Sequence, residues 1–335
     1  MARVALVGTG FIGAVHAAAY DGIENGELAA VISTSEKHGR EFAEKHGANY
    51  YPTLKAAVDK EKLDCVDICT PTKVHTDMVV EAAELGLHVL CEKPLALTLA
   101  DVDRMIEAVN RNGVKGMAGH TLRFWPEYVK VKEIVDSGRL GKPLHAFCTR
   151  LAATPDWHKN GWGMDEKAGG GASVDLHIHD LDFLIWLLGK PKLVNAVGVN
   201  DPGLGGVSHI STNISFADGP TAVAEGGWAF SSSFPFSMGF RVLCEKGTVE
   251  WTFRAGKNIE NRGDKAKVLV YKNDGSTEPL EVEDADAYTV QCKYFVDCID
   301  ADKEIETATL KDGRNALELA LAATKSAKEN RTVEI

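Results

Sequence analysis

A lysine and an aspartate–histidine pair are the side chains of this chain whose types and spacing best suit proton-transfer chemistry. Lys93 stands between Glu92 and Pro94, directly after a short apolar run. Asp175 and His179 are four positions apart, so on a helix they would share one face. An imidazole beside a carboxylate suits general acid–base work, because the carboxylate orients the ring and supports the imidazolium. A buried structural pair would show the same spacing, so the residues alone leave both interpretations open.

A glycine-rich string near the start of the chain is typical of a dinucleotide-binding loop. It follows the strand-like run 3–7 and precedes an alanine-rich, helix-compatible stretch. In this G-x-G-x-x-G context, Gly8 permits a tight turn, Gly10 lets the backbone approach a pyrophosphate, and Gly13 allows close packing of the helix. The free N–H groups that begin the helix would then face the diphosphate. We expect contacts to a nicotinamide dinucleotide from Gly8, Gly10, Phe11, Ile12 and Gly13.

The residues after the second predicted strand, 28–32, indicate which dinucleotide is preferred. An acid at this point accepts a hydrogen bond from the ribose 2′-hydroxyl of NAD. Here the chain has hydroxyl and basic side chains instead: Ser33, Thr34, Ser35, Lys37 and Arg40. Glu36 is the acid among them, and as the first residue of a helix it can simply complement the helix dipole. The sequence favours NADP, with NAD as the alternative.

Two further segments follow predicted buried strands. Thr70 and Pro71 come after the run 65–69, and Glu92 and Lys93 end the next strand. In open parallel sheets, ligands bind beyond the carboxyl ends of the strands. We therefore expect the cofactor site to include Thr70, Pro71, His75, Glu92 and Lys93.

The order of predicted elements determines how these residues are positioned. Strand-like and helix-like segments alternate over the first ~120 residues, which is typical of βαβ units and a parallel sheet covered on both faces. Strand-like runs with turn signals follow between 194 and 282, and one helix is expected within 169–188. We predict an α/β protein, with a doubly wound Rossmann domain at 1–119. Residues 120–335 should form a substrate-binding and oligomerisation domain with an open, mostly antiparallel sheet.

Local signals add detail to this scheme. Thr98, with Asp101 three positions later, predicts the N-cap and capping box of a helix over 99–110. The broad sheet of the second domain must be covered on both faces, so a homodimer or homotetramer is expected.

The bulk composition excludes several classes of protein. The net charge of −11 disfavours nucleic acid and anionic membranes as partners. No apolar run reaches the ~18–20 residues that a bilayer requires, and no targeting segment is recognisable. The seven cysteines contain no C-x-x-C pair, so reduced thiols in a cytoplasmic protein are expected rather than disulfides or a zinc ribbon.

These motifs, in this order, resemble those of the Gfo/Idh/MocA oxidoreductase family, and the resemblance spans the whole chain. The residues that carry it are Gly8 to Gly13, Thr70-Pro71, Glu92-Lys93-Pro94 and Asp175-x-x-x-His179. The resemblance implies a nicotinamide-dependent enzyme that acts on a secondary alcohol or ketone of a sugar, cyclitol or related polyol. It also implies that Lys93, Asp175 and His179 are catalytic. An NAD-dependent glycosidase and a nicotinamide-sensing regulator without turnover have similar sequences and remain alternatives.

A mechanism follows as a hypothesis. His179 would take the hydroxyl proton during oxidation, Lys93 would stabilise the developing alkoxide, and Asp175 would orient the substrate or the imidazole. Many members of the family have a small residue where His177 stands, so the common substrates do not transfer directly to this chain. Candidates for the carbohydrate side of the site are Arg123, Arg150, Trp157, His158, Trp162 and His177.

A metal-dependent hydrolase is a weaker interpretation of the same segment. His177, His179 and Asp182 could be ligands together with His158. The two nearer histidines are two positions apart, however, which splits them across a helix, unlike the i, i+4 pair of zinc proteases. We expect no metal.

Overall fold

The computed structural model describes residues 1–155, 166–255 and 266–335, and they form two compact units. The first unit comprises Met1–Trp125 and Ala285–Arg314, and the second comprises Pro126–Asp284 and Asn315–Ile335. The predicted division into 1–119 and 120–335 did not include this return of the chain to the first unit. Within the described residues, no helix combines the length and the apolar composition needed to cross a bilayer.

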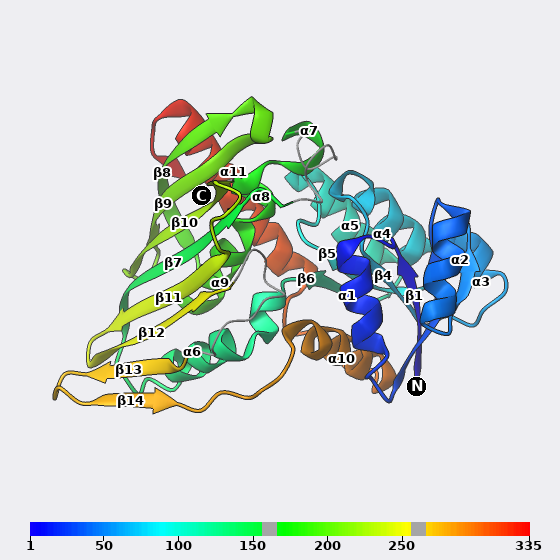
Figure 1. Ribbon diagram of the computed structural model, residues 1–335, viewed down its shortest axis with the longest axis horizontal. Helices are drawn as coiled ribbons and strands as arrows, with labels where there is room; N and C mark the ends of the chain where they lie inside the picture. Colours follow the sequence, from blue (N-terminus) through cyan, green and yellow to red (C-terminus); the bar gives the residue numbers. More distant parts are fainter. Residues whose placement is uncertain (156–165, 256–265) are drawn as a thin grey trace. The chain divides into compact units, whose positions relative to one another are not determined.

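The sheet of the first unit is parallel, as predicted, and it has six strands (Figure 1). Its strands, in the order β3-β2-β1-β4-β5-β6, are β3 (Asn49–Tyr51), β2 (Gly26–Ile32), β1 (Ala2–Val7), β4 (Cys65–Ile68), β5 (His88–Glu92) and β6 (Gly116–Gly119). This is the order of a doubly wound Rossmann sheet, in which the strand order reverses between β1 and β4. All four residues of β4 are buried, as expected where helices cover both faces.

Most helices of the first unit alternate with its strands, and α10 comes from the later part of the chain. They are α1 (Phe11–Tyr20), α2 (Glu36–Lys45), α3 (Leu54–Val58), α4 (His75–Glu84), α5 (Leu99–Arg111) and α10 (Ala287–Asp300), with short 3-10 turns η1 (Thr72–Val74) and η2 (Thr121–Phe124). The predicted N-cap of α5 is confirmed, because Thr98 Oγ1 accepts from the Asp101 N–H at 3.2 Å. The Asp101 carboxylate accepts from the Thr98 hydroxyl at 2.7 Å, rather than from the backbone N–H as in a capping box. Phe295 and Val296 of α10 share one apolar core with Tyr20 of α1.

The second unit is built on a nine-stranded sheet. Its strands are, in spatial order, β14 (Thr277–Leu280), β13 (Val268–Lys272), β12 (Gly247–Arg254), β11 (Ser237–Cys244), β7 (Pro143–Ala153), β10 (Thr221–Phe230), β9 (Gly206–Phe216), β8 (Pro191–Asp201) and β15 (Val333–Glu334). The pair β7–β10 is parallel and the other pairs are antiparallel. The prediction of a mostly antiparallel sheet is therefore confirmed.

Helices cover one face of this sheet (Figure 1). They are α6 (Pro126–Asp136), α8 (Ala172–Asp175), α9 (Ile178–Leu188) and the later part of α11 (Leu310–Glu329). The short α7 (Glu166–Gly169) and η4 (Pro202–Leu204) lie beside β9. The opposite face shows the strand alternation of a half-buried sheet. On β8, exposed Val197 follows buried Ala196, and on β11, exposed Leu243 follows buried Val242.

The single helix predicted within 169–188 is wrong, because the chain there forms two helices. α8 ends at Asp175 and α9 begins at Ile178. Between them, the His177 N–H donates to the Ala172 carbonyl at 2.9 Å, five residues back rather than four. This wider turn places Asp175 and His179 on different helices.

Candidate active site

The glycine loop between β1 and α1 has the geometry that a dinucleotide needs. Gly8 has a φ of +103°, and a Cβ there would lie 2.5 Å from the Cys69 carbonyl oxygen. A Cβ at Gly13 would lie 2.1 Å from the Gly8 oxygen, whereas one at Gly10 would meet nothing within 4 Å. The first turn of α1 holds no acid, so its N–H groups are available to an anion. The residues present fit a diphosphate that approaches at Gly10.

The turn after β2 carries hydroxyls, as its sequence indicates. Ser33 Oγ lies 3.3 Å from Thr9 Oγ1 in the glycine loop and accepts from the Ser35 N–H at 3.3 Å. Glu36, the nearest acid, is bound by Arg40 at 2.8 Å. Thr34, Ser35 and Lys37 are exposed at this turn. The position that an acid occupies in many NAD sites therefore presents a serine.

His75 joins the two strand-end segments that follow β4 and β5. Its Nε2 lies 2.8 Å from the Thr70 carbonyl, and its Nδ1 lies 3.1 Å from the Pro94 carbonyl. Burial lowers the pKa of His75, although these carbonyl contacts oppose the shift, so the neutral ring donates to one carbonyl at a time. The imidazole is buried and ties the loop at Thr70 and Pro71 to the one at Pro94. Its predicted contact with the cofactor remains a prediction.

Lys93 leaves the sheet directly beyond β5, at the carboxyl edge. Glu92, the last residue of β5, is buried, and its Oε2 accepts from the Lys93 N–H at 3.1 Å. Strands β1, β4 and β5 are neighbours, so the glycine loop, Thr70 and Lys93 follow adjacent parallel strands. This edge is where ligands bind in open α/β sheets.

In the second unit, Asp175 and His179 are half-buried while His177 is fully buried. His177 Nε2 lies 2.9 Å from Thr212 Oγ1, and a Cβ at Gly226 would lie 2.5 Å from its Nδ1. The ring thus packs onto the sheet through strands β9 and β10. The predicted catalytic residues are divided between the units, with Lys93 in the first and the Asp175–His179 pair in the second. Their convergence at one substrate remains a prediction.

The residues proposed for the carbohydrate side have different surroundings. Arg150 is buried and forms an ion pair with Asp180 at 2.7 Å. Arg123 is also buried and lies 3.2 Å from Asp312. Trp157, His158 and Trp162 lie outside the described residues. Both arginines therefore neutralise acids inside their own units, and their contact with a substrate remains a prediction.

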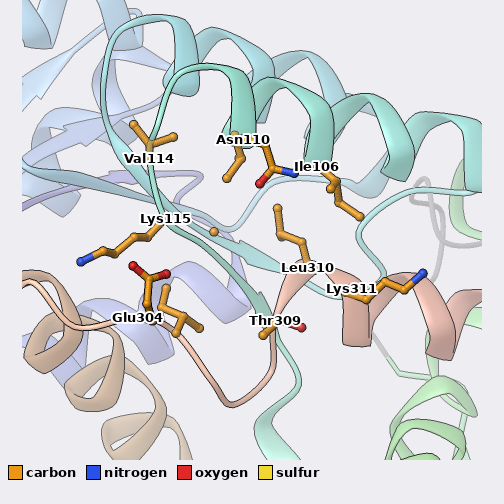
Figure 2. Close-up of a pocket in the computed structure, with 11 residues that line it drawn as sticks. Ile106, Asn110, Val114, Lys115, Glu304, Thr309, Leu310 and Lys311 are labelled. Carbon is orange, nitrogen blue, oxygen red and sulfur yellow. The ribbon is translucent and has the colours of Figure 1, made fainter.

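A hollow of about 270 Å³ lies at the opposite edge of the Rossmann sheet (Figure 2). Val109, Leu310 and Lys311 line it, and it reaches Lys115 and Gly116, where β6 begins. Since the glycine loop follows the carboxyl end of β1, this hollow is distinct from the expected cofactor site.

Two buried side chains close to the predicted site, His16 and Asp67, were not identified from the sequence. His16 lies three positions after Gly13, and Asp67 lies inside the apolar run that precedes Thr70. His16 Nδ1 is 2.8 Å from Asp67 Oδ2. An acid inside an otherwise apolar strand was the available signal, because buried carboxylates need a partner.

Comparison with known proteins matches both parts of the chain. The family model described as "Oxidoreductase family, NAD-binding Rossmann fold" matches residues 2–120, and "GFO/IDH/MocA C-terminal domain" matches residues 128–250. The myo-inositol 2-dehydrogenase of Thermotoga maritima is 29% identical over 99% of this chain and 98% of its own. The 1,5-anhydro-D-fructose reductase of Ensifer adhaerens is 28% identical over 92% and 91%. The aldose-aldose oxidoreductase structure from Caulobacter crescentus has a TM-score of 0.87 at 25% identity, covering 100% of this chain and 99% of that one.

Proposed function

Because the chain belongs to the GFO/IDH/MocA oxidoreductase family, we propose that it oxidises or reduces a sugar, cyclitol or related polyol at a secondary alcohol or ketone. The position of Lys93 beyond β5, at the sheet edge that carries the glycine loop, is the observation that supports this best. The names of the inositol dehydrogenase and the anhydrofructose reductase support the substrate class. When bound, the nicotinamide cofactor supplies or accepts the hydride.

Three side chains of this chain would handle the proton and the charge. His179 accepts the hydroxyl proton in the direction of oxidation and returns it in reduction. Lys93 donates a hydrogen bond to the same oxygen and stabilises negative charge on it. Asp175 orients the imidazole or the polar end of the substrate.

NADP is the proposed cofactor. Ser33 stands where an acid would repel a 2′-phosphate, and it lies within 3.3 Å of the Thr9 hydroxyl. Lys37 is exposed one turn further on and adds a positive charge to the same region. Glu36 is engaged by Arg40 at 2.8 Å, which reduces its repulsion of a phosphate.

Substrate and cofactor can be identified together. Cyclitols, aldoses, anhydro sugars and keto sugars are offered with NAD or NADP, in the oxidised and reduced forms, and the nicotinamide absorbance is followed. We expect turnover of at least one polyol with net change in the cofactor. Hydrolysis of a glycoside without net cofactor change, or no turnover of any polyol, would contradict the proposal.

The catalytic roles are tested once a substrate is known. Lys93→Met should lower kcat about 100–1000-fold, which is typical for loss of a donor to an oxyanion. His179→Ala should lower kcat about 100–10,000-fold and flatten the pH–rate profile where histidine titrates. Lys60→Met is a matched control, because Lys60 is exposed and precedes the start of β4, at the end of that strand opposite to Thr70. Dinucleotide binding and Tm should stay close to wild type in all three variants, and near-normal kcat in the first two would overturn the assigned roles.

A further inference from the structure

A histidine is buried between two carboxylates behind the strand ends of the first unit. His16, on α1, has Nδ1 at 2.8 Å from Asp67 Oδ2 and Nε2 at 3.3 Å from Glu92 Oε1. The exposed fractions of His16, Asp67 and Glu92 are 0%, 0% and 5%. Asp67 also accepts from the Tyr20 hydroxyl at 2.9 Å and from the Cys69 thiol at 3.4 Å. The imidazole thus connects the middle of β4 to the last residue of β5.

The surroundings of His16 favour its positive charge. Burial alone would lower the pKa of His16, but the Asp67 carboxylate raises it well above its usual range. Burial also raises the pKa values of the neighbouring Cys69 and Cys292 thiols, so they are protonated and uncharged at neutral pH. The charge that holds the imidazolium is therefore that of Asp67, and a buried ion pair of this kind needs both partners.

The Glu92 carboxylate contacts both His16 and the backbone of Lys93. Its Oε1 faces His16, and its Oε2 accepts from the Lys93 N–H at 3.1 Å. On the remaining side, a Cβ at Gly119 would lie only 2.4 Å from Glu92 Oε1, so the carboxylate lies against the backbone of β6. Without the imidazolium, Glu92 would face Asp67 across a cavity with no positive charge between them.

A bound metal ion is the competing interpretation of this cluster. Donor atoms of His16, Asp67 and Cys292 lie within 4.8 Å of one another. Tetrahedral zinc keeps nitrogen and oxygen ligands about 3.3 Å apart, whereas His16 Nδ1 and Asp67 Oδ2 are 2.8 Å apart. Tyr20 also donates to that same oxygen. The spacing is that of hydrogen-bonded partners.

We propose that His16, held by Asp67, is a positioning residue that fixes Glu92 and thereby the backbone from which Lys93 reaches the substrate. This inference rests on the proposed role of Lys93 and extends it to a residue one helix away. A shift of Lys93 by about 1 Å would be enough to lower the rate roughly 100-fold. The effect should appear in kcat, since the glycine loop and its diphosphate contacts are not altered.

Two substitutions of His16 separate its two contacts. In His16→Asn the amide takes the place of Nδ1, so the bond to Asp67 is kept and the contact with Glu92 is lost. In His16→Gln the amide reaches the place of Nε2, so a neutral donor stays beside Glu92 although the positive charge is lost. We expect His16→Asn to lower kcat about 10–100-fold with little change in KM or dinucleotide Kd, and His16→Gln to lower it less. A purely structural role would lower Tm in both variants and leave kcat per folded molecule unchanged.

A double-mutant cycle tests whether His16 acts through Glu92. Glu92→Gln keeps an acceptor for the Lys93 N–H but loses the charge that His16 holds, so kcat should fall. The variant with both His16→Asn and Glu92→Gln should then be no slower than the slower single variant. Additive losses, or full kcat in folded His16→Asn, would overturn the inference. If both His16 variants fail to fold, an unchanged kcat in Glu92→Gln overturns it.

The outcome for Lys93 distinguishes this inference from the proposed function. Full activity of Lys93→Met would contradict the function assigned to that lysine and, with it, the positioning role. A low kcat of the Lys93→Met variant together with a normal kcat of the His16→Asn variant would contradict the positioning role alone.

Discussion

Two buried histidines of this chain differ in charge, because their immediate neighbours differ: His16 is positively charged and His177 is neutral. His16 lies against a carboxylate, and its pKa is raised well above the usual range. His177 lies against the Thr212 hydroxyl, and burial, followed by the nearby charges of Arg150 and His209, lowers its pKa to about 3. Equal burial therefore gives an imidazolium in one place and a neutral ring in the other, because only one site contains an anion.

His177 should make the protein less stable as the solution becomes acidic. Its pKa is about 3 in the folded chain against 6.5 for an unperturbed histidine, so below pH 6.5 the unfolded chain binds a proton that the folded chain does not. The free energy of unfolding should fall by about 1.4 kcal/mol per pH unit below pH 6.5. Urea unfolding between pH 7.5 and 5 measures this slope, and His177→Asn should remove that part of it. Equal slopes in the two proteins would contradict the expectation.

Ser33 should determine which dinucleotide binds more tightly. Ser33→Asp places a negative charge beside the expected 2′-phosphate, so NADP binding should weaken by about 10- to 100-fold while NAD binding is kept. Fluorescence titration with both cofactors measures the change. Ser33→Asn is the matched control, because it adds similar volume without charge. If wild type binds NAD more tightly than NADP, the proposed preference is wrong, while the glycine loop assignment stands.

At the scale of elements, the start of α5 depends on one side chain. Thr98 accepts from the Asp101 N–H and donates to the Asp101 carboxylate, which satisfies a backbone donor that the helix leaves unpaired. Thr98→Ala should lower the free energy of unfolding by about 0.5–2 kcal/mol, and Thr98→Ser should lower it less. Denaturant unfolding checks both, and equal stability of Thr98→Ala and wild type would show that the cap contributes nothing.

Elements defined by local signals could be predicted, whereas those shaped by tertiary contacts could not. The strand–glycine–helix unit at β1 and α1 and the N-cap of α5 are encoded in consecutive residues. The break between α8 and α9 is not, because the apolar pattern continues through it. There the His177 ring packs against Gly226 on a strand about 50 positions later in the sequence. For α10, the helix itself could be predicted from its residues, but its place in the first unit could not, because that depends on an apolar core shared with α1.

The candidate site shows the same difference between features encoded in consecutive residues and features that depend on tertiary contacts. Lys93 and the glycine loop are recognisable because each follows an apolar strand at short range. The contact between His16 and Glu92 joins residues that are far apart in the sequence. A single sequence contains no pattern that pairs them. These buried ionic contacts were not predicted, because the periodicity of apolar residues indicates which positions are buried but not which polar side chains contact each other.

At the scale of the whole molecule, the face of the nine-stranded sheet that none of the described helices covers is the surface most suited to a second subunit. By strand register, Tyr271, Leu243 and Val197 lie on this same face of the sheet. Their exposed fractions are 38%, 44% and 61%. Apolar side chains spread over one broad face are typical of an interface between subunits.

We therefore expect a homodimer or homotetramer that forms through this face. A C2 interface places the same patch of both subunits in contact, so one substitution alters both sides at once. Val197→Asp adds a charge to an exposed position of the patch and should leave the fold of each chain intact, yet it should shift the protein towards monomers. Light scattering at micromolar concentration measures the mass. Ser232→Asp, which adds the same charge in the exposed turn after β10, should leave the assembly unchanged. A wild-type monomer, or equal masses for wild type and Val197→Asp, would exclude assembly through this face.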